Sequence, residues 1–460
     1  MTIDPGSQPV RPDTARALLA RVARAQVEGR APSLSVGVVR DGALVWSAGR
    51  GSVAGVPPTT DTQYRIGSIT KGFTAVLIMR LRAEGRLGLE DRVDQHLPGT
   101  VFGDRVIGDL LAHAGGLAAE PPGPWWERST GQAWSELAAS FSRDLVLGPP
   151  GGFHYSNPGY ALLGEIVARH RDRSWYDALH DEVLVPLGMT RTTYGPEAPA
   201  APGLAVHPFA DVTMPEVVQD LGAMAPAGQL WSTVGDLARW VAFVAGDTSD
   251  VLAASTMAQM RRSRVIADDP LLWQSGYGLG FQVLRTSERE LVGHGGSVPG
   301  FLAFIAVDVD RGVGLVELAN ATSGPVFSGP DLLSILETYE PAVAPAWRPV
   351  DRLPEEMVDA VGIWHWGPAP FLLRMKGTEA LDLSPAGGTG RGSGFVRRAG
   401  SWVGISGYWR DERLRVVRRP DGTVSHLDIG TFVFTREPYD PTAPIPGGIS
   451  DTPWSTPPSR

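Results

Sequence analysis

The sequence predicts an α+β fold, with an antiparallel sheet flanked by helices, followed by a small all-β barrel. β-rich runs lie near the start of the chain and again at 277–320, while the part between them reads mostly as helix. This segregation is typical of an α+β layout and not of the alternating strands and helices of a parallel sheet. Beyond a Pro- and Ala-rich stretch, short strands at meander spacing replace the helices, which predicts the barrel.

The chain of 460 residues is longer than one ordinary core supports, so two domains are expected. We expect a flexible tail at 1–12, a first domain at 13–340 and a linker at 341–354. The barrel domain is expected at 355–439. A tail rich in Pro, Ser and Thr, expected to be disordered, follows at 440–460.

Each element of the first domain rests on a local pattern. Asp13 or Thr14 can cap a helix with one apolar face, and Asp41-Gly42 is a strong hairpin signal between two β-rich runs. The helices are expected at about 13–28, 68–81, 106–113, 134–146, 158–171, 175–185, 233–245 and 328–339. The strands are expected at 33–40, 43–48, 63–66, 277–284, 290–294, 301–308 and 312–320. The last four should pair antiparallel and join the hairpin in one sheet.

The barrel strands follow the same reasoning, with Asp421-Gly422 as a hairpin turn. They are expected at 360–366, 371–375, 380–383, 394–397, 402–409, 414–418, 425–429 and 431–435.

Composition excludes several classes of function. The net charge of −9, with no basic run longer than Arg-Arg pairs, does not favour binding to nucleic acid. The chain has no cysteine, which excludes thiol catalysis and cysteine metal sites, and its nine histidines show no pair spacing for a metal, so neither a metal nor a cofactor is expected. The first residues lack the pattern of a secretory signal, and no stretch is long enough to span a membrane, so a cytoplasmic location is expected.

Ser68 and Lys71 are the first candidate catalytic pair. Ser68 opens an apolar run with helical spacing, where unpaired backbone N–H groups and the positive end of the helix dipole would lie beside it. Residues three apart on a helix are neighbours, so the Lys71 amine would lie beside the Ser68 hydroxyl. It could then act as the base that activates this nucleophile. A helix cap followed by a surface lysine is the plainer alternative. This alternative is weakened because lysine occurs only at Lys71 and Lys376, while arginine supplies the other positive charges. A lysine at this position can lose its proton and act as a base, which an arginine cannot do.

Two further segments complete the candidate site. Tyr155 and Asn157 precede a helix, and a nearby Lys⁺ is expected to lower the pKa of the Tyr155 phenol so that it can act as a general base. His294-Gly295-Gly296-Ser297 ends a strand with two bare glycines, so a substrate could lie along its backbone. The Ser297 N–H could then join that of Ser68 in an oxyanion hole.

Taken together, Ser-x-x-Lys, Tyr-x-Asn and His-x-Gly in this order resemble the active-site-serine family of class C β-lactamases, D-alanyl-D-alanine carboxypeptidases and esterases. The resemblance covers about residues 15–340 and includes the phrases at 110–117, 186–189, 227–233 and 277–281. It implies a β-lactamase/transpeptidase-like sheet with a helical subdomain, and a penicillin-binding-protein-like enzyme with an appended, lipocalin-like barrel.

The resemblance also implies roles for the site residues. Ser68 would be acylated, Lys71 and Tyr155 would move protons, and Asn157 would contact a substrate amide. The backbone N–H groups of Ser68 and Ser297 would hold the oxyanion. Trp125 and Trp126 lie in a segment that borders the pocket in this family, so one of them could line the acyl site or cap the core.

The third motif departs from the family's usual Lys-Thr-Gly, which holds a substrate carboxylate. His294 and Gly295 replace the cation and the hydroxyl, and neutral imidazole is a poorer carboxylate anchor. We therefore expect a serine hydrolase that acts on a small-molecule or peptide ester or amide, with little β-lactamase activity. Alternatives are a transacylase or peptide-releasing thioesterase that takes a carrier-bound thioester, or a catalytically silent binding scaffold. The sequence gives no oligomeric state.

Overall fold

The structure is a computed structural model that describes residues 9–287, 289–322, 329–341 and 346–439. It divides into two compact units, Met1–Ala342 and Val343–Arg460. Of the segments predicted as tails and linker, 1–8, 342–345 and 440–460 lie outside the described residues.

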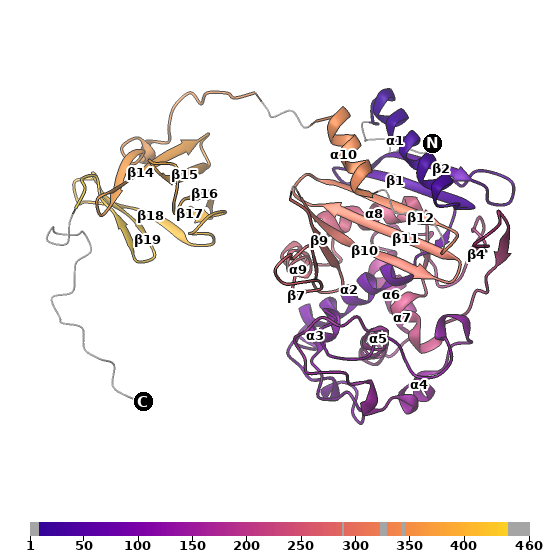
Figure 1. Ribbon diagram of the computed structural model, residues 1–460. Helices are drawn as coiled ribbons and strands as arrows, with labels where there is room; N and C mark the ends of the chain where they lie inside the picture. Colours follow the sequence, from indigo (N-terminus) through magenta and orange to yellow (C-terminus); the bar gives the residue numbers. More distant parts are fainter. Residues whose placement is uncertain (1–8, 288, 323–328, 342–345, 440–460) are drawn as a thin grey trace. The chain divides into compact units, whose positions relative to one another are not determined.

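The first unit is built on one antiparallel sheet in the order β2-β1-β12-β11-β10-β9-β8-β7 (Figure 1). Its strands are β1 (Ser33–Arg40), β2 (Ala43–Gly51), β7 (Val265–Ile266), β8 (Ser275–Tyr277), β9 (Gln282–Arg285), β10 (Glu290–Val298), β11 (Phe301–Asp308) and β12 (Val313–Ala319). The late strands therefore join the N-terminal hairpin, which confirms the predicted α+β sheet. The predicted strand at 277–284 is wrong in detail, because Gly280 at φ +90° turns the chain and separates β8 from β9.

Both faces of this sheet are covered, because β1 is buried along almost all of its length. Leu34, Val36 and Val38 alternate onto one face, where they join the core with helices α1 (Pro12–Glu28) and α10 (Gly329–Tyr339). The other face packs against helix α8 (Val234–Ala245). The first unit is thus a three-layer arrangement with the sheet in the middle.

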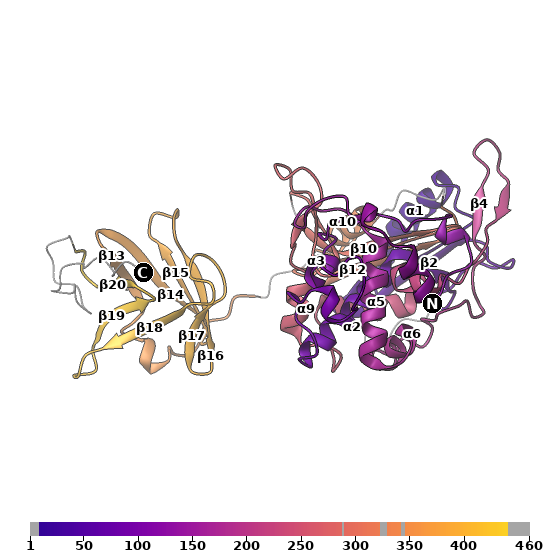
Figure 2. The ribbon, with the colours of Figure 1, turned by 90° about the horizontal axis from the view of Figure 1, so that it is seen from below.

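The helical subdomain lies beside the sheet, where α2 and α5 run next to each other (Figures 1 and 2). The remaining helices are α2 (Thr70–Ala83), α3 (Ile107–Leu111), α4 (Trp134–Ser140), α5 (Asn157–Arg171), α6 (Trp175–Leu179), α7 (Ala225–Gly228) and α9 (Ala254–Met260). Two short strand pairs, β3 (Tyr64–Arg65) with β6 (Trp231–Ser232) and β4 (Leu204–Val206) with β5 (Thr213–Pro215), complete the unit.

Several predicted helices are shorter than their apolar patterns suggested. The one at 134–146 ends at Ser140, and the one at 175–185 continues from α6 as a π turn, His180–Leu184. The helix expected from Ser68 onward begins as a tight 3-10 turn, Gly67–Ile69, before α2. Helix α9 was not predicted, because its short segment offers little periodicity.

Helix α2 is buried on almost all sides, which fixes its position. Phe73 of α2 stacks on Trp240 of α8 with ring centroids 3.7 Å apart. Arg80 and Arg82 in its last turn complement the negative end of the helix dipole. A nucleophile at its start therefore rests on one of the most firmly packed elements of the unit.

The second unit is an antiparallel barrel in the order β13 to β20. Its strands are β13 (Gly362–Trp366), β14 (Ala369–Lys376), β15 (Ala380–Pro385), β16 (Ser393–Arg398), β17 (Ser401–Gly404), β18 (Arg413–Arg418), β19 (Val424–Ile429) and β20 (Phe432–Phe434). His365 and Thr435 exchange backbone hydrogen bonds of 2.7 and 2.9 Å, so the first and last strands meet and the sheet closes. The predicted all-β barrel is confirmed.

Within the described ranges, none of the helices combines the length and the apolar character that crossing a bilayer demands.

Candidate active site

The structure brings Ser68 and Lys71 into direct contact. The Lys71 Nζ lies 2.9 Å from the Ser68 Oγ and donates a second hydrogen bond of 2.7 Å to the carbonyl oxygen of Ala227. Lys71 is completely buried, whereas Ser68 is partly exposed. The predicted helical spacing thus produces a reachable alcohol with an amine fixed beneath it.

Burial lowers the pKa of Lys71 from its usual 10.5 to about 7. The carboxylates of Glu120 and Glu127 act in the opposite direction and raise that pKa. At neutral pH a large fraction of Lys71 is therefore the free amine, which can accept a proton from Ser68.

Tyr155 reaches the same place but differs electrostatically from the prediction. The Lys71 Nζ lies 4.9 Å from the centre of the Tyr155 ring. Burial raises the pKa of Tyr155, and Glu120 and Glu127 raise it further, whereas an interaction with the Ser68 side chain acts to lower it. The expectation of a lowered phenol pKa is therefore wrong, because loss of hydration and the charges of Glu120 and Glu127 outweigh the interaction with Ser68. Tyr155 is a phenol at neutral pH, suited to donate or relay a proton.

His113 holds Tyr155 in place. The two rings lie 4.1 Å apart, and the His113 Nδ1 accepts the Ser156 N–H at 3.0 Å. Burial lowers the pKa of His113 well below its usual value, so the ring is neutral. His113 is thus a positioning residue for Tyr155.

The β10 strand edge packs directly against the turn that carries Ser68. A Cβ atom on Gly296 would lie 2.0 Å from the Ile66 carbonyl oxygen, and one on Gly67, at φ +51°, would lie 2.8 Å from the Ser297 nitrogen. Only glycine permits this approach.

The β10–β9 pairing stops at Gly293, opposite Gln282. On that same side of β10, the Gly295 N–H donates to the Gln282 Oε1 at 3.1 Å. Because strand groups alternate with a period of two, the Ser297 N–H faces the same side, toward Gly67. This places it beside Ser68, as an oxyanion hole would require.

His294 is buried and forms its hydrogen bonds with other protein groups. Its Nε2 is 2.7 Å from the Tyr277 hydroxyl, and its Nδ1 contacts the Gly295 carbonyl oxygen. Because a carbonyl only accepts, Nδ1 carries the proton and Nε2 accepts from Tyr277. Burial and the Lys71 charge lower the pKa of His294 to about 3. The imidazole is therefore neutral, and both of its nitrogens have protein partners.

Asn157 faces a residue that the sequence did not single out. Its Nδ2 donates to both carboxylate oxygens of Glu120 at 3.1 Å, and the Trp126 Nε1 donates to the same carboxylate at 2.6 Å. Trp125 is 58% exposed and donates to Glu127. The two tryptophans predicted to border the pocket thus each hold a carboxylate whose charge acts on Lys71.

Trp126 lies close to the segment that binds Lys71. Its ring is 3.8 Å from where a Cβ on Gly228 would lie, next to the Ala227 carbonyl that binds Lys71. It also lines a small cavity of about 50 Å³ together with Leu137 and Leu221.

Sequence reasoning missed Glu120 and Glu127 because single carboxylates in a loop rich in Gly and Pro carry no pattern. The same holds for the Ala227 carbonyl, which is a backbone group. The available signals were that Trp125 and Trp126 lie in a segment expected to border the pocket, and that Ala227 belongs to one of the phrases that carry the resemblance.

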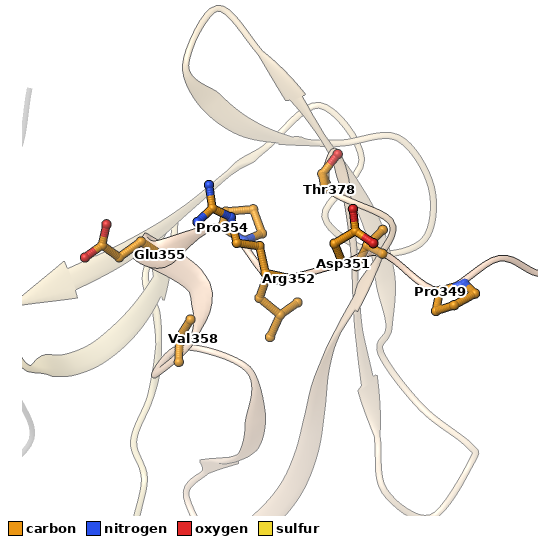
Figure 3. Close-up of a pocket in the computed structure, with 9 residues that line it drawn as sticks. Pro349, Asp351, Arg352, Pro354, Glu355, Val358 and Thr378 are labelled. Atoms are coloured by element: carbon orange, nitrogen blue, oxygen red, sulfur yellow. The ribbon is translucent and has the colours of Figure 1, made fainter.

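The second unit contains a separate cavity of about 920 Å³. It is lined by Pro349–Glu355, Val358 and Thr378 (Figure 3). Asp351, Arg352 and Glu355 supply its charge, with no lysine or histidine among the lining residues. The serine–lysine arrangement of the first unit is therefore not repeated among these lining residues.

Comparison with known proteins agrees with this geometry. The family described as Beta-lactamase matches residues 19–340, and a Domain of unknown function (DUF7586) matches residues 353–436. Penicillin-binding protein 4 of Amycolatopsis lactamdurans is 30% identical over 363 residues, which cover 72% of this chain and 93% of that protein.

Two solved structures are also similar. The D-stereospecific amidohydrolase from Streptomyces sp. shares 26% identity at a TM-score of 0.57, over 73% of this chain and 100% of that chain. SurE in complex with D-Leu shares 25% identity at a TM-score of 0.57, over 93% of this chain and 100% of that chain. The family match spans more than half of the chain and contains Ser68, Lys71, Tyr155 and His294. The chain therefore belongs to the beta-lactamase family of serine hydrolases.

Proposed function

We propose that this protein hydrolyses amides or esters of D-configured amino acids through an acyl-enzyme on Ser68. The observation that carries the proposal is the amine of Lys71, whose pKa is about 7 and whose Nζ lies 2.9 Å from the Ser68 Oγ. An alcohol held by a partly neutral, dry amine is an activated nucleophile.

The proposed acylation step conserves every proton. Lys71 accepts the Ser68 proton as Oγ attacks the substrate carbonyl carbon. The developing oxyanion accepts hydrogen bonds from the N–H groups of Ser68 and Ser297. The Tyr155 hydroxyl gives its proton to the leaving group as the scissile bond breaks, and Lys71 returns a proton to Tyr155. Water then attacks the ester by the reverse sequence and frees Ser68.

The charge around the site supports substrates without a carboxylate beside the scissile bond. Glu120 and Glu127 act electrostatically on Lys71, so their field reaches the reacting atoms. His294 is neutral and hydrogen-bonded within the protein, so it supplies no cation for a substrate carboxylate. These features disfavour β-lactams and C-terminal carboxylate peptides and tolerate neutral or ammonium-bearing groups. D-configuration is proposed from the similarity to the D-stereospecific amidohydrolase and to SurE with D-Leu.

A substrate panel tests the proposal. D- and L-phenylalanine amide, a D-Ala-D-Ala peptide and nitrocefin would be compared by kcat/KM, with Ser68→Ala as the blank. We expect the D-amide to exceed the L-amide by about tenfold or more, a discrimination of about 1.4 kcal/mol, and the carboxylate substrates to react least. Preferential turnover of nitrocefin or of the L-amide would contradict the proposal.

The choice between water and an amine as the acyl acceptor needs its own measurement. The acyl-enzyme would be formed from a p-nitrophenyl ester, and glycinamide would be added at increasing concentration. Hydrolysis predicts that the free acid remains the main product. Amide product that rises in proportion to glycinamide would favour the transacylase.

A further inference from the structure

A second cavity in the first unit lies outside the Ser68 site. Its volume is about 560 Å³, within the range of small-molecule pockets. Helix α5 supplies Ala161, Gly164 and Ala168, which share one helical face, and Ala225 and Pro226 of α7 form another wall. Ser68, Lys71 and Tyr155 are not among its lining residues.

The lining is rich in aromatic rings. Trp134, Tyr176 and Tyr194 are partly buried around the cavity, and Trp175 is buried in its wall. They come from α4, α6 and the chain that follows α6, so the folded subdomain assembles them in one place. Such rings favour flat apolar groups, and their faces attract cations.

The charged side chains that line the cavity are acidic. Glu165 and Asp220 are its ionisable carboxylates, with no lysine, arginine or histidine among the lining residues. Glu165 pairs with Arg169 at 2.9 Å, and Asp220 accepts hydrogen bonds from the Tyr194 hydroxyl and the Gly222 N–H. The buried Arg65, which does not line the cavity, interacts electrostatically with Asp220, so the cation of each carboxylate lies outside the cavity and both carboxylates line it. Burial raises the pKa of Tyr194, its hydrogen bond to Asp220 raises it further, and the Arg65 charge acts in the opposite direction.

We propose that this pocket binds an arylalkylamine, a molecule whose aromatic ring packs among Trp134, Tyr176 and Tyr194 while its ammonium group faces Asp220 and Glu165. The inference does not depend on acyl chemistry at Ser68. The pocket nevertheless shares an element with that site, because the carbonyls of Pro226 and Ala227 accept hydrogen bonds from Thr74 and Lys71.

The test compares three probes with one ring system, namely tryptamine, 3-ethylindole and indole-3-propionate, by isothermal titration calorimetry on the full chain. Tryptamine should bind about tenfold or more tightly than indole-3-propionate, with 3-ethylindole between them, because the carboxylates attract one probe and repel the other. Binding should persist in Ser68→Ala, which separates this pocket from the acyl site.

Two variants locate the binding. Ala168→Phe fills the cavity from α5 and should abolish tryptamine binding, whereas Ala20→Phe, on the exposed side of α1, should leave it intact. Asp220→Asn should reduce the preference for tryptamine over indole-3-propionate. Equal affinity for the two probes, or tryptamine binding that is unaffected by Ala168→Phe in a folded protein, would overturn the proposal.

Discussion

Lys71 is the side chain whose surroundings decide whether Ser68 can react. Its amine is buried, lies 2.9 Å from the Ser68 Oγ and has a pKa of about 7. The only other lysine, Lys376, lies in the barrel strand β14. Substitution of Lys376 can therefore serve as the control for substitution of Lys71.

Replacing Lys71 by arginine should reduce kcat/KM for a p-nitrophenyl ester by about a thousandfold, because arginine cannot release the proton that a general base must first lose. Lys376→Arg should retain the wild-type rate. Both rates would be read from p-nitrophenol release, and circular dichroism would verify folding. A folded Lys71→Arg protein within a few-fold of wild type would remove Lys71 from the role of base.

The same amine predicts the pH dependence. Because only neutral Lys71 accepts a proton, kcat/KM should rise with pH to a midpoint near its pKa of about 7 and then level off. Glu120 raises the pKa of Lys71, so Glu120→Gln should move the midpoint to lower pH. Glu136→Gln, on the exposed surface of α4, is the matched control. A midpoint that stays in place, or moves upward, in Glu120→Gln would refute this electrostatic coupling.

The residues of the site differ in how far the sequence could predict them. Ser68 and Lys71 are three apart on one helix turn, so their contact follows from local geometry alone. The pKa of Tyr155 depends on burial and on Glu120 and Glu127, which reach it from another loop. No local pattern carries that information, and the predicted direction was accordingly wrong.

At the scale of elements, the site depends on the approach of β10 to the turn at Ser68. The bare backbone of Gly296 and the left-handed Gly67 remove the side chains that would hold the two apart. The glycines at 295 and 296 looked equivalent in the sequence. The structure separates them, because a Cβ on Gly295 meets nothing within 4 Å.

Gly296→Ala should therefore lower the free energy of unfolding by about 1–3 kcal/mol, since its methyl group would clash with the Ile66 carbonyl oxygen. Gly295→Ala should change it by less than about 0.5 kcal/mol. Urea titrations followed by tryptophan fluorescence would measure both. The reverse ranking would show that β10 does not pack against the Ser68 turn as described.

Strands with clear alternation or hairpin signals were predictable, and 301–308 matches β11 residue for residue. The predicted strand at 277–284 failed because the turn that divides it depends on Gly280, which lies over Ala75 and Gly72 of α2. That packing involves a helix about two hundred residues earlier in the chain, so no pattern within 277–284 could predict it.

At the scale of the whole molecule, the chain consists of two units with separate cores. One core surrounds the sheet and α2, and the barrel has its own, built around Trp364, Phe395 and Leu427. A change of composition and strand spacing was enough to predict two domains. The sequence could not predict what the barrel does, because its function depends on a substrate that no motif specifies.

Truncation after Ala342 should leave a folded first unit, because its core contains none of the barrel's residues. Its rate of Ser68 acylation by a small ester should stay within about threefold of the full chain. Differential scanning calorimetry and p-nitrophenol release would test both points, and an unfolded fragment or a rate reduced by more than about tenfold would contradict them.

The central claim is that Ser68 is a nucleophile activated by Lys71, and covalent labelling tests it most directly. Incubation with a fluorophosphonate followed by intact-protein mass spectrometry should show one adduct, which peptide mapping assigns to Ser68. Ser68→Ala should remain unlabelled, and Lys71→Arg should label far more slowly. A wild-type protein that stays unmodified, or an adduct that persists in Ser68→Ala, would contradict the account.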